Sequence, residues 1–209
     1  MQYSYYQKND KSLVIIPNIH VAVEEQFNDL KFKIDSLTQQ GYFLYYEGVN
    51  VHITDTTTIL KANKITGIEN TKGLKTQFDK IIKNPKGRMQ RLIMQPKFTS
   101  LGATEENSKN MDLTMREVVD KYEEKFGEII LNDCDYASFN NEDIKCKKSP
   151  DVPRENSKYA MTEIRDQYIV NQIIKEGKDK VVMVYGKEHY KGMHPLFIEN
   201  GYQLIDSLK

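Results

Sequence analysis

Short apolar runs alternate along this chain with longer stretches that carry apolar residues on one side only. The runs predict strands at 12–19, 42–51, 91–95, 128–136, 180–186 and 202–208. Apolar residues spaced three and four apart predict helices over 21–40, 112–127 and 157–176, a short helix at 195–200, and one or two more between 54 and 85. Such alternation is typical of an α/β fold. We expect one three-layer domain over residues 1–209, with a mostly parallel or mixed central sheet and helices on both faces.

Charge and length narrow the class of protein. The chain has 209 residues, and its 30 Lys and Arg balance its 30 Asp and Glu, so the formal net charge is zero. No overall field attracts nucleic acid, and we expect no nucleic-acid partner. No stretch approaches the roughly 18 apolar residues that span a bilayer, and the first residues lack the features of a signal peptide. The sequence therefore predicts a cytoplasmic protein without a membrane span.

Cys134 and Cys146 are the two cysteines of the chain. Neither has a partner at the C-x-x-C spacing of zinc or redox motifs. We interpret them as two free thiols, as expected in a reducing compartment.

Three titratable residues stand at the ends of predicted apolar runs, namely His20, Glu47 and His189. Glu47 follows YFLYY (42–46), where Glu47 and Gly48 interrupt the second predicted strand. In open parallel sheets the ligand site lies beyond the carboxyl ends of the strands, where loops and helix N-termini converge. Each residue alone is more simply explained as a surface or capping residue. Because all three fall at the same predicted edge, they form a candidate site.

Two imidazoles and one carboxylate suit two kinds of chemistry. They could hold a divalent ion such as Mn, Co or Zn, which would lower the pKa of a bound water. Alternatively, a carboxylate-oriented histidine could act directly as general base on water. Gly186 and Gly192 flank His189 and would let backbone and substrate approach closely. The residue types alone leave both mechanisms open.

Four segments together resemble a known superfamily. They are IPNIHVAVEE (16–25), YYEG (45–48), EIRDQYIVNQI (163–173) and VYGKEHYKGMHPLFIENGYQLI (184–205). Their order is similar to that of the landmarks in the group that includes TraB and PrgY pheromone-shutdown proteins, TIKI proteases, GumN-like proteins, ChaN and the erythromycin esterases. The resemblance covers nearly the whole chain.

The resemblance assigns roles to individual residues. His189 with Gly186 matches the second G-x-x-H motif of the superfamily, and His20 matches the histidine of the first, where Pro17 replaces the glycine. It implies catalytic roles for His20, Glu47, Arg165 and His189, tentative metal ligation by His20, Glu47 and His189, and substrate contacts from Tyr46, Asp166, Gly186 and Gly192.

The implied function is a hydrolase of the TraB/TIKI type that cleaves a peptide or ester bond with water activated by histidine or by a metal. Its substrate would be a peptide or a small molecule. One alternative is a non-catalytic module that binds a peptide or small ligand in the same cleft. Another is a haem-binding module, in which Tyr45, Tyr46, Tyr185 or Tyr190 would supply an axial phenolate.

Overall fold

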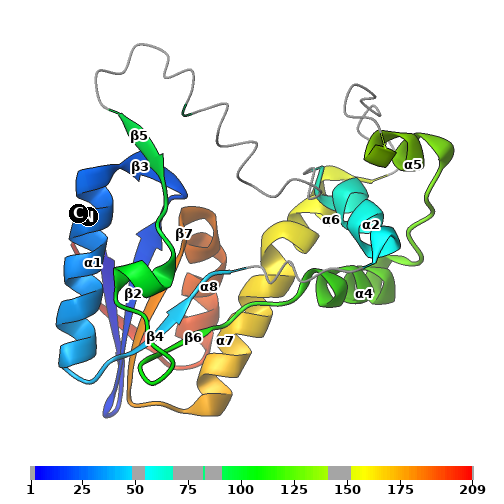
Figure 1. The fold of residues 1–209 in the computed structure, drawn as a ribbon. Coiled ribbons are helices and arrows are strands. Elements are labelled where there is room, and N and C mark those ends of the chain that lie inside the picture. Colours follow the sequence, from blue (N-terminus) through cyan, green and yellow to red (C-terminus); the bar gives the residue numbers. More distant parts are fainter. Residues whose placement is uncertain (1–2, 49–54, 68–81, 83–90, 141–151, 209) are drawn as a thin grey trace. The chain divides into compact units, whose positions relative to one another are not determined.

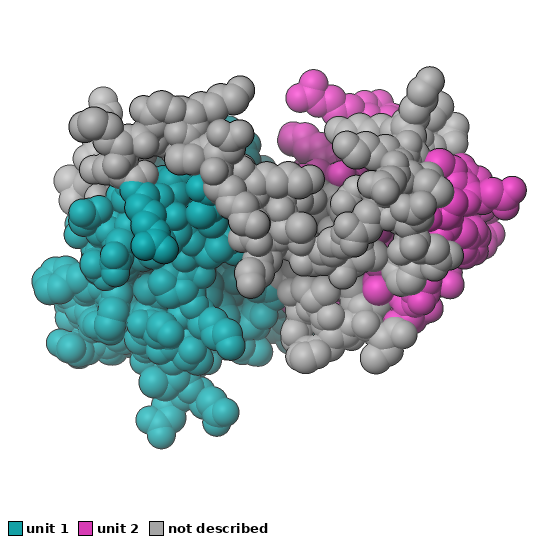
Figure 2. Space-filling view, turned by 45° about the horizontal axis from the view of Figure 1, so that its top comes forward, with its two compact units in different colours: residues 1–48, 75–111, 169–209 teal, residues 49–74, 112–168 magenta. Residues whose placement is uncertain are grey.

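The computed structural model describes residues 3–48, 55–67, 82, 91–140 and 152–208 (Figure 1). By their internal contacts the residues group into two compact units (Figure 2). Unit 1 contains Met1–Gly48, Lys75–Met111 and Ile169–Lys209, and unit 2 contains Val49–Leu74 and Asp112–Tyr168. The expectation of a single domain over residues 1–209 stays a prediction.

A six-stranded sheet forms the centre of unit 1, with the strand order β6-β4-β7-β2-β1-β8. Its strands are β1 (Tyr3–Lys8), β2 (Lys11–Asn18), β4 (Phe43–Tyr46), β6 (Ser108–Asn110), β7 (Lys180–Gly186) and β8 (Gln203–Leu208). The four strands from β6 to β2 are parallel to one another, whereas β1 pairs antiparallel with both β2 and β8. The predicted α/β class with a mostly parallel, mixed sheet is confirmed.

The inner strands are apolar on both faces, as expected of strands that helices cover from two sides. On β7, the five residues 181–185 are all buried. One face packs on α1 (Glu24–Gln39), whose buried stripe is Phe27, Leu30 and Ile34. Helix α8 (Lys187–Glu199) covers the other face and buries Met193 and Phe197 (Figure 1). Unit 1 therefore has the predicted three layers.

The predicted strand at 91–95 exists but belongs to a different sheet. As β5 (Leu92–Met94) it pairs antiparallel with β3 (Val21–Val23), in a separate two-stranded sheet. Because residues 21–23 are in this ladder, α1 begins at Glu24 rather than at residue 21. A 3-10 turn, η2 (Phe98–Leu101), follows β5.

Unit 2 is helical in its described residues. It contains α2 (Thr56–Thr66), α4 (Met115–Phe126), α5 (Asp133–Asn140), α6 (Arg154–Lys158), the π-helical turn η3 (Tyr159–Glu163) and the start of α7 (Ile164–Glu176). Its core is an apolar cluster made of Ala62, Ile65, Leu113, Met115, Val118, Val119, Tyr122, Ile129, Ala160 and Ile164. Helix α2 confirms one predicted helix between 54 and 85, and the candidate at 72–84 lies outside the described residues except for Ile82.

The predicted strand at 128–136 is wrong. Residues 128–132 belong to no helix or strand, and α5 starts at residue 133. The backbone N–H of Asn132 donates to Asp135 Oδ2 at 2.9 Å, and that of Asp135 donates to Asn132 Oδ1 at 3.1 Å. This reciprocal pair caps a helix N-terminus. Ile129 is buried in the unit 2 cluster, so its apolar character reflects helix packing rather than a strand.

Other boundaries also differ from the sequence prediction. The helix predicted at 112–127 begins later, as α4 at Met115, with Thr114 as its N-cap in a capping box with Glu117. The predicted helix at 195–200 begins much earlier, at Lys187, because it starts directly after β7 and tolerates Pro195 in its interior. Strands β1 and β6 were not predicted, since one is rich in tyrosine and the other is short and polar.

The interpretation of the cysteines as free thiols is wrong, because Cys134 is disulfide-bonded. The other cysteine of the sequence, Cys146, lies outside the described residues. The lack of a C-x-x-C spacing does not exclude a disulfide. The cysteines therefore give no support for a reducing compartment. Within the described part of the chain, no helix has the length and apolar character needed to cross a membrane.

We expect Thr114→Ala to lower the free energy of unfolding by about 1 kcal/mol, because it removes the side-chain oxygen that caps α4. Urea unfolding measures the loss. The matched control is Thr99→Ala at an exposed position of η2, which should change the free energy by less than about 0.5 kcal/mol. Equal losses in the two variants would contradict the assignment of Thr114 as the cap.

Glu176, at the end of α7, gives a pH-dependent prediction. Burial alone raises the pKa of its carboxyl, but hydrogen bonds from Lys109 and Tyr45 outweigh burial, and the pKa is lowered overall. A carboxyl with a lowered pKa in the folded state adds stability above its unfolded pKa and loses it as the pH falls through the folded value. Glu176→Gln should therefore be less stable at pH 7, by about 1 kcal/mol.

The deficit of Glu176→Gln should shrink as the pH falls below about 4.5, the ordinary value for a glutamate. Urea unfolding at pH 7 and pH 3 measures it. Glu128→Gln, at an exposed position, is the control and should follow wild type at both pH values. A deficit that is constant with pH would show that the Glu176 carboxylate does not contribute through ionisation.

Candidate functional site

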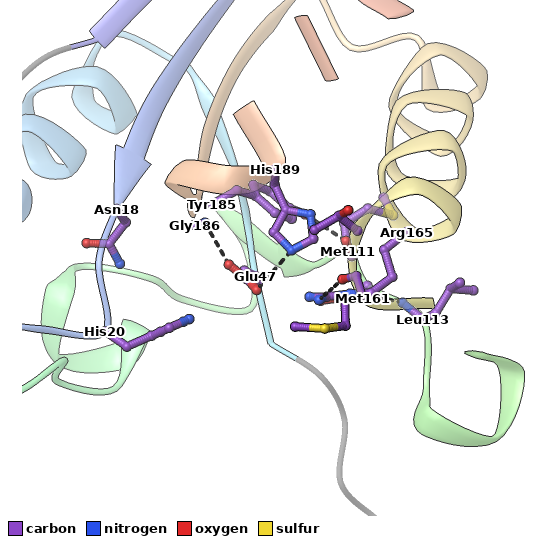
Figure 3. Close-up of polar contacts among 12 residues, drawn as sticks. Asn18, His20, Glu47, Met111, Leu113, Met161, Arg165, Tyr185, Gly186 and His189 are labelled. Carbon is purple, nitrogen blue, oxygen red and sulfur yellow. Dashed lines mark hydrogen bonds and ion pairs between the residues drawn. The ribbon is translucent and has the colours of Figure 1, made fainter. Parts of the chain in front are cut away.

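The pairing of β2, β7 and β4 brings three strand ends to one edge of the sheet. Asn18 of β2 lies opposite Gly186 of β7, and Tyr46 of β4 lies opposite Val184. Because the three strands are parallel, the residues that follow them leave the sheet at the same carboxyl edge. Figure 3 shows Glu47, Gly186 and His189 grouped there.

Glu47 is fixed to β7 by its backbone and by its side chain. Its N–H donates to the Val184 carbonyl at 3.1 Å, which extends the β4–β7 ladder by one residue. Its Oε2 accepts the Gly186 N–H at 2.7 Å. A Cβ atom at residue 186 would lie 3.0 Å from that oxygen. Glycine at this position therefore permits the close approach, as the sequence suggested for a residue near the site.

His189 lies in the first turn of α8, which follows β7 without a loop, with Gly186 as N-cap. The histidine is buried, and its Nε2 lies 3.3 Å from Glu47 Oε1. A single carboxylate thus connects the end of β7 to the imidazole of α8 (Figure 3).

His20 follows β2 and is held by a residue that the sequence analysis did not single out. Its Nδ1 lies 3.2 Å from Gln95 Oε1, and the Gln95 N–H donates to the His20 carbonyl at 2.8 Å. The same Oε1 accepts the Nδ2–H of the buried Asn18 at 2.8 Å. In Figure 3 the His20 ring points toward the side on which Glu47 lies. Asn18 could have been recognised in the sequence as a polar residue at the end of a predicted strand. Gln95 could not, because nothing in the sequence of 91–95 links its uncharged amide to His20.

Arg165 and Asp166 belong to α7 in unit 2. The Arg165 guanidinium makes a bidentate pair with the wholly buried Asp112 side chain, with Nε–Oδ1 2.9 Å and Nη2–Oδ2 2.6 Å. Its Nη1 donates to the Met161 carbonyl at 2.9 Å. This geometry is that of a strong charge-assisted pair. The role predicted for Arg165, toward Glu47 or toward a substrate, stays a prediction, as does the substrate contact of the buried Asp166.

The sequence also predicts substrate contacts for Tyr46, which lies in β4, and for Gly192, which lies in α8. Tyr46 stacks on Phe98 of η2, with ring centroids 4.3 Å apart, and joins the apolar cluster on the α1 face. Its ring is therefore part of the packing of unit 1. Gly192 lies in α8, three residues after His189. Contacts of either residue with a substrate stay predictions.

Three of the four tyrosines considered as haem ligands make hydrogen bonds within the protein. Tyr45 donates to Glu176, and the buried Tyr185 hydroxyl donates to the Met111 carbonyl at 2.7 Å. The Tyr190 hydroxyl lies 2.9 Å from Ser4 Oγ. Haem ligation by any of the three would first have to break one of these bonds.

The contacts of Glu47 bear on the predicted metal ligation. In the described ranges, no three or more His, Cys, Asp or Glu side chains are grouped so that they could hold a metal. The two oxygens of Glu47 face the Gly186 N–H and His189 Nε2 instead. This arrangement suits a carboxylate that orients a histidine, and ligation of Mn, Co or Zn by His20, Glu47 and His189 stays a prediction.

Comparison with protein-family models, with curated proteins and with solved structures gave no match to this chain. The resemblance to the TraB/TIKI group therefore stays a prediction. The fold class by itself does not determine the function.

We expect Gly186→Ala to lower the free energy of unfolding by about 1 kcal/mol, because the new methyl group crowds Glu47 Oε2. The backbone of Gly186 (φ −53°, ψ 143°) is open to alanine, so conformational strain adds nothing. In the Glu47→Ala background the same substitution should be neutral or stabilising by up to about 1 kcal/mol, because alanine restricts the unfolded chain. A double-mutant cycle from urea unfolding measures the coupling. Equal costs in both backgrounds would rule out the Gly186–Glu47 contact.

Proposed function

We propose that this protein is a hydrolase that cleaves a peptide or ester bond with water activated by His189, which Glu47 orients. One observation carries the proposal: Glu47 accepts the Gly186 N–H with one oxygen and faces His189 Nε2 with the other. A histidine held by a carboxylate is the usual arrangement of a general base. The carboxyl edge of a parallel sheet is also where α/β proteins bind their ligands.

The reaction needs only water and the substrate. Nε2–H of His189 would donate to Glu47, so that Nδ1 accepts a proton from water as the water oxygen bonds to the carbonyl carbon. The resulting imidazolium is stabilised by the Glu47 carboxylate. When the tetrahedral intermediate collapses, the bond from carbon to the leaving nitrogen or oxygen breaks, and His189 returns its proton to that atom. The products are a carboxylic acid and an amine or alcohol.

His20 would supply a second imidazole from the neighbouring strand end. Its attachment to Gln95 keeps it at the same edge as the Glu47–His189 pair. Groups held on strand and helix ends are preorganised, which lowers the cost of aligning them with a substrate. The zero net charge gives no long-range attraction for nucleic acid, in keeping with a peptide or small-molecule substrate.

The test is hydrolysis of a panel of peptides, aryl esters and lactones by wild type, His189→Ala and Glu47→Gln. We expect His189→Ala to lower kcat about 10²- to 10⁴-fold, because it removes the general base. Glu47→Gln should lower kcat about 10- to 100-fold, because the imidazole remains but its orienting carboxylate does not. The control is His194→Ala, which removes another histidine of α8 and should retain wild-type kcat.

Two outcomes would overturn the proposal. One is wild-type turnover that survives His189→Ala in a folded variant, as judged by circular dichroism. The other is absence of turnover on all three substrate classes, which would favour the non-catalytic binding module. Elemental analysis of the same preparations separates the two mechanisms. About one ion per chain, lost in His189→Ala, would replace the direct general base with a metal-bound water.

A further inference from the structure

Gln95 contacts the segment that carries His20 at three points. Its backbone N–H donates to the His20 carbonyl at 2.8 Å. Its side-chain Oε1 faces His20 Nδ1 at 3.2 Å and accepts from Asn18 Nδ2 at 2.8 Å. The residue directly follows β5, so its position is set by the β3–β5 pairing. A residue held at the end of a ladder is placed more firmly than one on a free loop.

The contact to His20 determines which ring nitrogen carries the proton. An amide oxygen can only accept hydrogen bonds, so Nδ1 of His20 must be the donor in its contact with Gln95 Oε1. In a neutral imidazole, a proton on Nδ1 leaves the lone pair on Nε2. The Asn18 amide donates to the same oxygen and fixes the orientation of the Gln95 side chain.

We infer that Gln95 is a positioning residue of the site: it holds neutral His20 in the Nδ1–H form, so that Nε2 is the nitrogen that can accept a proton. The catalytic part of this inference rests on the proposed hydrolase function. The tautomer itself does not, because it follows from the contact of two side chains. His20 and His189 would then share one feature, a ring nitrogen that faces a fixed side-chain oxygen.

The test measures the tautomer of His20 directly, by two-bond ¹H–¹⁵N correlation spectra of protein labelled with ¹⁵N-histidine. The spectra are recorded near pH 8.5, well above the ordinary imidazole pKa of about 6.5. The chain has 4 histidines, so a His20→Asn variant assigns the signals. We expect the Nδ1–H form in wild type and in Gln95→Glu, which keeps an acceptor oxygen. In Gln95→Leu the Nδ1–H form should lose its predominance.

Activity provides the second measurement. Gln95→Leu should lower kcat/KM about 10- to 100-fold, the usual effect of losing a residue that orients a reactive histidine. Gln95→Glu should recover most of that loss. The matched control is Gln26→Leu, the same substitution at an exposed position of α1, which should leave both the tautomer and kcat/KM unchanged.

The results separate failure of this inference from failure of the proposed function. An Nε2–H signal for His20 in wild type, or an unchanged tautomer in folded Gln95→Leu, would overturn the role of Gln95 whatever the activity. If the expected tautomers are found but no substrate is turned over, the positioning of His20 by Gln95 is supported and only the proposed hydrolase function is contradicted. If Gln95→Leu does not fold, wild type and Gln95→Glu still decide, since both must show the Nδ1–H form.

Discussion

The parallel pairing of β7 with both β2 and β4 is the constraint on which the site depends. Residues 181–185 of β7 are buried, and its ladders with β2 and β4 hold the carboxyl ends of the three strands at one edge of the sheet. Because both faces of β7 are buried, the register of these ladders is set by how its apolar side chains fit against the layer on each face. The same register determines that Glu47 leaves β4 within reach of the Gly186 amide.

Much of unit 1 could be predicted because its elements have clear hydrophobic patterns. The strands of the buried sheet centre, β2 and β7, are continuous apolar runs, and α1 has an apolar stripe of helical period. The prediction failed where an apolar run fits either a strand or a segment packed on helices, and where a strand has no apolar pattern. The run Glu128–Leu131 has the composition of a strand, yet Ile129 packs among helices and Ile130 is exposed. β6 has only three polar residues, and its place in the sheet comes from pairing with β4.

The candidate site, too, could be predicted only in part. Glu47 and His189 could be proposed together because both follow apolar runs, and parallel strands end at a common edge. The sequence could not show that His189 belongs to a helix, because Gly192 and Pro195 conceal the start of α8. It also could not indicate Gln95, whose link to His20 depends on the small β3–β5 sheet. Contacts between strands distant in sequence have no local pattern.

The contact between Glu47 and Gly186 has an evolutionary consequence. Residue 186 takes part through its backbone N–H, and the carboxylate occupies the space that a side chain there would need. The two positions are therefore not independent in the course of sequence change. A descendant of this chain that gained a side chain at 186 would be under pressure to shorten or lose the residue at 47, whereas one that kept the carboxylate would be more stable with glycine at 186. Covariation of these two positions would be the trace of this contact in any lineage that has kept the site.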